Sequence, residues 1–178
     1  MNLAYQHIMH SSQQCRRGFT LIEVLVALVV LSIGLLGMAK LVMVSSHAND
    51  SAYLRSQATA QAYAILDNMR ANLSAASAHD YDTALNTMPA APAACNVSGT
   101  PCAPTQLALY DVYNWKQHLN APTGALPSGT GSIVTSAGLP VTATIIVEWD
   151  DAAAQAAFGA TPIGVAAPMS VTLETVLQ

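Results

Sequence analysis

Residues 16–44 read RRGFTLIEVLVALVVLSIGLLGMAKLVMV, and this stretch decides the fold of the chain. Between Phe19 and Val44, 20 of the 26 residues are apolar, and the run from Val24 to Ala39 carries no charge. The hydrocarbon core of a bilayer is about 30 Å thick, and a helix needs about 20 apolar residues to cross it. The segment from Phe19 to Ala39 is therefore predicted to span a membrane once.

The charges that flank this segment are asymmetric. Arg16 and Arg17 precede it, and the first 18 residues contain no acidic residue. Because basic flanks stay on the cytoplasmic side of a membrane, the N-terminus is predicted to be cytoplasmic and the C-terminal part to lie outside. A cleaved secretory signal peptide fits poorly, since the apolar run is too long and no small-residue cleavage site follows it. A permanent single-pass anchor that carries a sensor or an enzyme stays open on hydropathy alone.

Glu23 lies at the start of this otherwise apolar stretch. A charged side chain in the bilayer core costs about 2.5–3.5 kcal/mol on insertion scales, and such groups are usually paired and functional. Arg17 lies six residues before Glu23, off its helical face. An amine at Phe19 would lie one helical turn away, but it exists only if the chain is cut after Gly18. The position of Glu23 therefore favours processing at Gly18.

The sequence Arg-Arg-Gly-Phe-Thr-Leu-Ile-Glu of residues 16–23, followed by the apolar run, closely resembles the class III signal of type IV pilins and type II secretion pseudopilins. The resemblance implies that a prepilin peptidase removes residues 1–18, including Arg16 and Arg17, by cutting after Gly18. It further implies that the same enzyme N-methylates Phe19. Glu23 and Thr20 then correspond to the residues with which the family assembles.

The resemblance also implies a function, that of a minor pilin, a structural and priming subunit of a type IV pilus. Its expected partners are the prepilin peptidase, other minor pilins, major pilin subunits and the inner-membrane assembly machinery. The implied location is the inner membrane with a periplasmic head, and after assembly a fibre used in adhesion and twitching motility. Major pilins usually carry a kinking proline late in the span, where this chain has Lys40. A minor pseudopilin of a type II secretion system has the same N-terminal chemistry and stays open as the alternative.

The helix that begins in the membrane is predicted to continue beyond it. No proline occurs between Met1 and Met88, and apolar residues recur at three- and four-residue spacing, which is one stripe of an amphipathic helix. The stripe consists of Leu54, Ala58, Ala62, Ile65, Leu66, Met69 and Leu73. We expect one helix from Thr20 to about Ala75, about 80 Å long. Its residues 19–44 would span the bilayer, and its residues 45–76 would pack on the domain that follows.

Residues 77–178 are predicted to form a globular head. A short helix is expected over 105–120, between a Pro-Thr start and an Asn-Ala-Pro stop. Strands are expected over 132–135, 141–149 and 169–177, where β-branched and apolar residues alternate with polar ones. A long helix that packs on a small antiparallel sheet is an α+β fold, which is also what the family resemblance implies.

The chain contains three cysteines. Cys95 and Cys102 lie close together in a loop rich in alanine and proline, and outside the cytoplasm such a pair favours a disulfide. Two free thiols remain the alternative. Cys15 lies in the predicted leader, so its removal would leave one pair in the mature chain.

The composition argues against an enzyme and against a nucleic-acid-binding protein. Only 9% of the 178 residues are charged, whereas about 25% is typical of soluble domains. From Ser45 onward the chain has three basic and nine acidic residues, a net charge of −6 that repels phosphate. No catalytic motif and no set of metal ligands with suitable spacing is present in the sequence. We therefore expect no catalytic residues, no metal and no cofactor.

Overall fold

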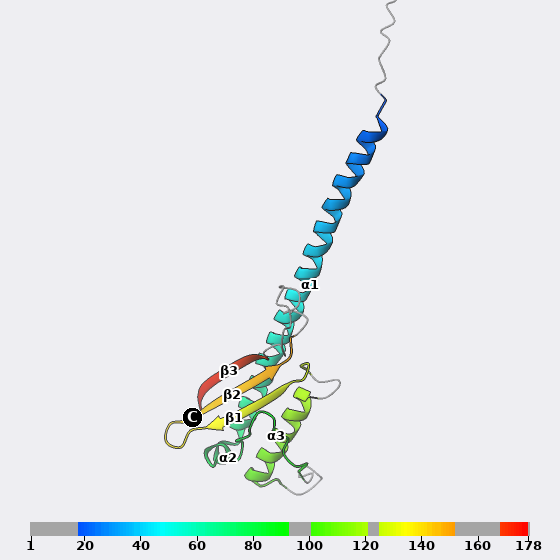
Figure 1. Ribbon diagram of the computed structural model, residues 1–178. Helices are drawn as coiled ribbons and strands as arrows, with labels where there is room; N and C mark the ends of the chain where they lie inside the picture. The colour runs from blue at the N-terminus through cyan, green and yellow to red at the C-terminus, as the bar shows by residue number, and fades with distance from the viewer. Residues whose placement is uncertain (1–17, 93–100, 121–124, 152–167, 178) are drawn as a thin grey trace, which may run out of the picture. The chain divides into compact units, whose positions relative to one another are not determined.

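The computed structural model describes residues 18–92, 101–120, 125–151 and 168–177 (Figure 1). Its elements are α1 (Leu21–Ala71), α2 (Leu73–Ser77), α3 (Pro104–Asn120), β1 (Thr130–Thr135), β2 (Val141–Trp149) and β3 (Met169–Leu177). The chain forms two compact units, Met1–Leu41 and Val42–Gln178, which we describe separately. The predicted α+β class is confirmed, because the second half of α1 packs with the three strands in the second unit.

The N-terminal helix ends earlier than the sequence predicts. Helix α1 stops at Ala71, and the shorter α2 follows after Asn72, which leaves the helical region with φ −129° and ψ 58°. The Asn72 side chain is buried, and its Nδ2 donates a hydrogen bond to the Pro104 carbonyl oxygen at 2.8 Å. This hydrogen bond joins Asn72 to the start of α3. In an uninterrupted helix, the Asn72 side chain would not have this partner.

The apolar stripe on the second half of α1 forms the helical side of the core. Five of its predicted members are buried: Ala58, Ala62, Ile65, Leu66 and Met69. Leu54 packs against this core from its edge. Leu73 is exposed instead, because the break at Asn72 turns the next helix so that Ala75 and Ala76 face inward.

The three strands form one antiparallel sheet in the order β1-β2-β3. Burial alternates along β2, as expected for a strand with one covered and one outward face. The inward side chains are Val141, Ala143, Ile145, Val147 and Trp149. The bounds predicted for β2 and β3 are confirmed, whereas β1 begins two residues before the predicted start, because Thr130 pairs with Glu148.

Helix α3 closes the head beside β1 (Figure 1). Its residue Trp115 is buried, and the indole Nε1 donates a hydrogen bond to the Gln61 carbonyl oxygen of α1 at 3.0 Å. The Trp115 ring covers Gly131 of β1, where a Cβ atom would collide with three ring atoms. One side chain therefore links α3 to both α1 and the sheet.

A cluster of three hydrogen-bonded polar side chains, Asn72, Tyr81 and Asp111, holds the turn after α2 in place. The Tyr81 side chain is fully buried, and its hydroxyl donates a hydrogen bond to Asp111 Oδ2 at 2.8 Å. Asn72 Nδ2 approaches the same hydroxyl at 3.4 Å. Burial raises the pKa of Tyr81 and also raises the pKa of Asp111, while the bond from Tyr81 lowers the latter in part. This polar cluster thus links the ends of α1 and α2 to α3.

Replacing Gly131 by alanine is expected to destabilise the head by about 1–3 kcal/mol, because the added methyl group overpacks the contact with the Trp115 ring. The free energy of unfolding of the full chain in detergent can be followed by the fluorescence of its two tryptophans, Trp115 and Trp149, which are both buried. Gly34→Ala is the matched control, since no atom lies within 4 Å of the Cβ that it adds. Equal unfolding midpoints for the two variants would contradict the role of this contact.

Candidate processing and assembly site

The described part of the chain begins at the predicted cleavage site. The Thr20 carbonyl oxygen accepts hydrogen bonds from the backbone N–H groups of Glu23 and Val24, at 3.1 and 3.3 Å. The Thr20 Oγ1 atom also accepts from the Glu23 N–H, at 3.4 Å. Thr20 is therefore the N-cap of α1, and Glu23 occupies the third helical position. A threonine followed three residues later by a glutamate is the spacing of a capping box.

This cap gives Glu23 a local role at the start of α1, besides the predicted charge pair. An acidic residue in the first turn of a helix interacts favourably with the partial positive charge of the helix N-terminus. The signal for this role is the Thr-x-x-Glu spacing itself, which is visible in the sequence. Any test of Glu23 in assembly must therefore separate the charge of the side chain from its capping ability.

Gly18 and Phe19 are freely accessible in this unit. No atom lies within 4 Å of the position that a Cβ on Gly18 would occupy, and Phe19 is 83% exposed. The fold itself therefore places no requirement for glycine at position 18. Arg16 and Arg17 lie outside the described residues.

Phe19 and Glu23 border the same shallow surface hollow. The other residues around it are Val24, Ala27, Leu28 and Leu31. The structure thus places Phe19 and Glu23, the two residues of the predicted charge pair, on one side of this segment. An amine at Phe19 forms only when the peptide bond between Gly18 and Phe19 is cut. In the uncut chain, the Glu23 carboxylate therefore lacks this amine as a partner.

The first part of α1 presents an apolar surface on every side. All 23 residues from Leu21 to Met43 are exposed, and 16 of them have large apolar side chains. Helix α1 is long and apolar enough to cross a membrane, with a mean hydropathy of 2.6 over its most apolar 18 residues. Such a surface is stable only in lipid or against other protein.

The polar clusters of the head hold turns in place. Thr135 Oγ1 donates to Asp82 Oδ1 at 2.8 Å, and His79 Nδ1 lies 2.6 Å from the same hydroxyl oxygen. Since the hydroxyl proton is directed at Asp82, the imidazole must donate to the oxygen and does not act as its base. This arrangement differs from a nucleophile with an orienting base.

Two further acidic side chains of the second unit, Asp80 and Asp151, accept hydrogen bonds from hydroxyl groups. Asp80 accepts from Thr105 Oγ1 at 2.9 Å, and Asp151 accepts from Ser51 Oγ at 2.5 Å. Within the described ranges, no group of three or more histidine, cysteine, aspartate or glutamate side chains is placed to hold a metal ion. These carboxylates fasten loops and strand ends to the helices.

The predicted disulfide falls partly outside the described residues. Cys102 lies half-buried just before α3, whereas Cys95 belongs to the segment that the structure does not describe. Cys15 lies in the leader, which is likewise outside the description. The pairing of Cys95 with Cys102 therefore stays a prediction.

Comparison with known proteins identifies one family model, the prokaryotic N-terminal methylation motif, which matches residues 13–39. No curated protein and no solved structure matches the chain. The motif supports the type IV pilin-like family and indicates a structural protein, processed by a prepilin peptidase and assembled into a pilus or a pseudopilus. The apolar helix that carries the motif suggests anchoring in a membrane.

Proposed function

We propose that the protein is a minor pilin, a structural and priming subunit of a type IV pilus. The observation that carries this proposal is the methylation motif at residues 13–39, which overlaps the exposed apolar first part of α1. The sequence Leu-Ser-Ile-Gly-Leu-Leu-Gly-Met-Ala of residues 31–39 also resembles the minor pilin PilV. That resemblance favours the pilus over the pseudopilus of a type II secretion system.

Before processing, the basic pair at Arg16 and Arg17 holds the leader in the cytoplasm. Residues 19–44 then lie in the inner membrane, and residues 45–178 form the periplasmic part, with 45–76 as the amphipathic half of the helix and 77–178 as the head. Cleavage after Gly18 removes the leader and frees the helix for extraction into a filament. The membrane thus stores an apolar helix that other subunits later cover.

Cleavage also creates the cation that Glu23 lacks. An α-amine has a pKa of about 7.7–8.0 and is largely protonated at neutral pH. In the apolar core of a filament, the Glu23 carboxylate pairs with the methylated amine of Phe19 on a neighbouring subunit. A shift in register leaves a buried charge without its partner, which costs about 3–5 kcal/mol. Glu23 therefore sets the register, and the exposed apolar surface of α1 supplies adhesion.

The proposal is tested by isolating the protein from cells that express it with its native partners. The expected product begins with N-methylated Phe19, as read by mass spectrometry of the N-terminal peptide. After cross-linking, we expect it to be recovered with major and minor pilins and with components of the inner-membrane assembly machinery. Cells without the prepilin peptidase are the control, and in them the chain should keep residues 1–18.

The outcomes separate the rival functions. Recovery of a processed chain with pseudopilins in place of pilins would assign it to a type II secretion system. An intact N-terminus in cells that contain the peptidase would overturn the proposal and favour a single-pass sensor or enzyme.

A further inference from the structure

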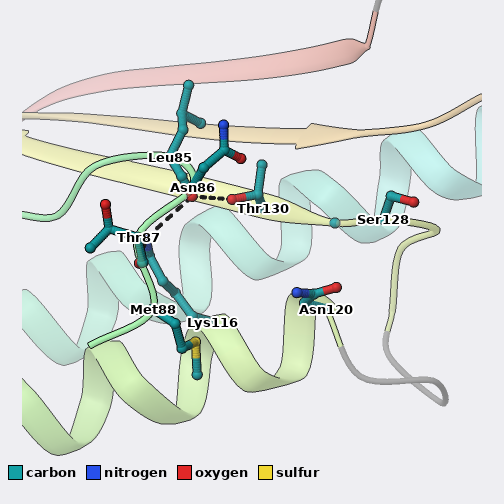
Figure 2. Close-up of a pocket in the computed structure, with 9 residues that line it drawn as sticks. Leu85, Asn86, Thr87, Met88, Lys116, Asn120, Ser128 and Thr130 are labelled. Carbon is teal, nitrogen blue, oxygen red and sulfur yellow. Dashed lines mark hydrogen bonds between the residues drawn. The ribbon is translucent and has the colours of Figure 1, made fainter. Parts of the chain in front are cut away.

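A small polar cavity lies in the head. It has a volume of about 220 Å³ and lies between the loop Leu85–Met88, the end of α3 and the turn that leads into β1 (Figure 2). Six of its nine lining residues have polar side chains: Asn86, Thr87, Lys116, Asn120, Ser128 and Thr130. The volume is below the range of about 300–1,000 Å³ that is typical of sites for drug-sized ligands. The cavity therefore suits a small polar group.

A buried cation forms one wall of this cavity. The Lys116 side chain is only 4% exposed, and its Nζ donates hydrogen bonds to the carbonyl oxygens of Ala84, Leu85 and Thr87, the last at 2.5 Å. Figure 2 shows the side chain rising from α3 to this loop. These three carbonyl groups use the three N–H bonds of the ammonium, but they carry no formal charge.

The charge of Lys116 is not balanced by an acid close to it. Lys116 takes part in neither the Arg70–Asp67 ion pair of α1 nor the His79–Asp82 ion pair of the head. None of the described residues that line the cavity is acidic. Burying an ionised group without an opposite charge is costly, and this burial lowers the pKa of Lys116. An anion in the cavity would reduce that cost.

The surroundings make the cavity selective for an anion with hydrogen-bond acceptors. Lys116 is the only lysine or arginine that follows Arg70 in the sequence, and the chain from Ser45 onward has a net charge of −6. An anion is therefore repelled by most of the head and attracted at this point. The side-chain amides of Asn86 and Asn120 and the hydroxyl of Ser128 can donate hydrogen bonds to its oxygens.

We propose that this cavity binds a carboxylate group, with Lys116 supplying the charge and the polar side chains around it supplying hydrogen bonds. The group can come from a free small carboxylate or from an acidic side chain of a neighbouring protein. Both sources present the same planar, singly charged pair of oxygens. The proposal concerns the head alone and does not depend on the function proposed above.

The test uses the full chain in detergent, labelled with ¹³C at its methionine methyl groups. Met88 lines the cavity and reports its occupancy, whereas Met69 is fully buried in the core and serves as the internal control. The probes are sodium acetate and N-acetylglutamate amide, and sodium chloride and N-acetylglutamine amide at equal ionic strength are their controls. We expect both carboxylates to shift the Met88 signal in a saturable way without shifting that of Met69.

Two variants test the contribution of the charge and of the cavity. Lys116→Gln removes the charge but keeps an amide that can donate to the carbonyl oxygens, and it should weaken carboxylate binding about tenfold or more. If the Met69 signal shows that this variant does not fold, Asn120→Phe is used, because it fills the cavity and leaves Lys116 in place. It should abolish the shift.

The results can overturn the proposal in three ways: no saturable shift with either carboxylate, an equal shift with chloride, or unchanged binding in the folded variant. Tighter binding of N-acetylglutamate amide than of acetate would assign the site to an acidic side chain of another protein. The reverse order would assign it to a free small carboxylate.

Discussion

Replacing Gly18 by leucine is expected to leave the protein uncut, with residues 1–18 still attached. The structure shows open space around Gly18, so the larger side chain does not disturb the fold. We therefore expect any requirement for glycine at this position to come from the peptidase that cuts the chain. We expect cleavage to slow by about 100-fold or more, which corresponds to about 2.7 kcal/mol on the activation barrier. The ratio of precursor to mature protein on an immunoblot measures this effect.

A second glycine offers a matched control. Gly37→Leu introduces the same side chain at another position where no atom lies within 4 Å of the added Cβ. It lies well beyond the cleavage site, so its processing should be normal. A Gly18→Leu chain of mature size, beginning at Phe19, would contradict cleavage after Gly18.

Local sequence patterns are sufficient to predict the strands, and they are also the basis on which the N-terminal site is proposed. Strands β2 and β3 alternate apolar and polar side chains over most of their nine residues, with breaks at Ile146 in β2 and at Thr175 and Val176 in β3, and their predicted bounds are confirmed. The site residues Gly18, Phe19, Thr20 and Glu23 all lie in one short motif. Their predicted roles depend on partners that recognise the extended sequence, so they can be proposed without the fold of the head.

The features that the sequence did not predict depend on contacts between distant residues. No glycine or proline marks the helix break at Asn72 in the sequence. The Asn72 side chain donates a hydrogen bond to the carbonyl oxygen of Pro104, 32 residues away. Lys116 is buried because the carbonyl groups that surround it come from a loop about 30 residues earlier. A lysine on a short helix is normally solvated, so no local pattern distinguishes this one.

The replacement of Glu23 by valine is expected to permit membrane insertion and processing while preventing incorporation into the filament. Insertion becomes easier because a charged group that costs about 2.5–3.5 kcal/mol in the bilayer core is removed. Incorporation fails because the Phe19 amine of the neighbouring subunit loses its partner in the filament core. An unpaired buried charge costs about 3–5 kcal/mol, which corresponds to a loss of about 100-fold or more. The measurement compares the mature protein in sheared pili with that in the membrane.

Two further variants separate the charge of Glu23 from the cap at Thr20. They are needed because Glu23 occupies the third helical position after this cap. Glutamine is as suitable as glutamate at this position of a capping box but carries no charge. If Glu23 acts through its charge, Glu23→Gln should fail as Glu23→Val does, whereas Thr20→Ala should weaken only the helix end, by about 0.5–2 kcal/mol. If Glu23 acts only through the cap, Glu23→Gln should assemble normally and Thr20→Ala should be impaired. Normal incorporation of Glu23→Gln would therefore exclude the charge pair as the determinant of register.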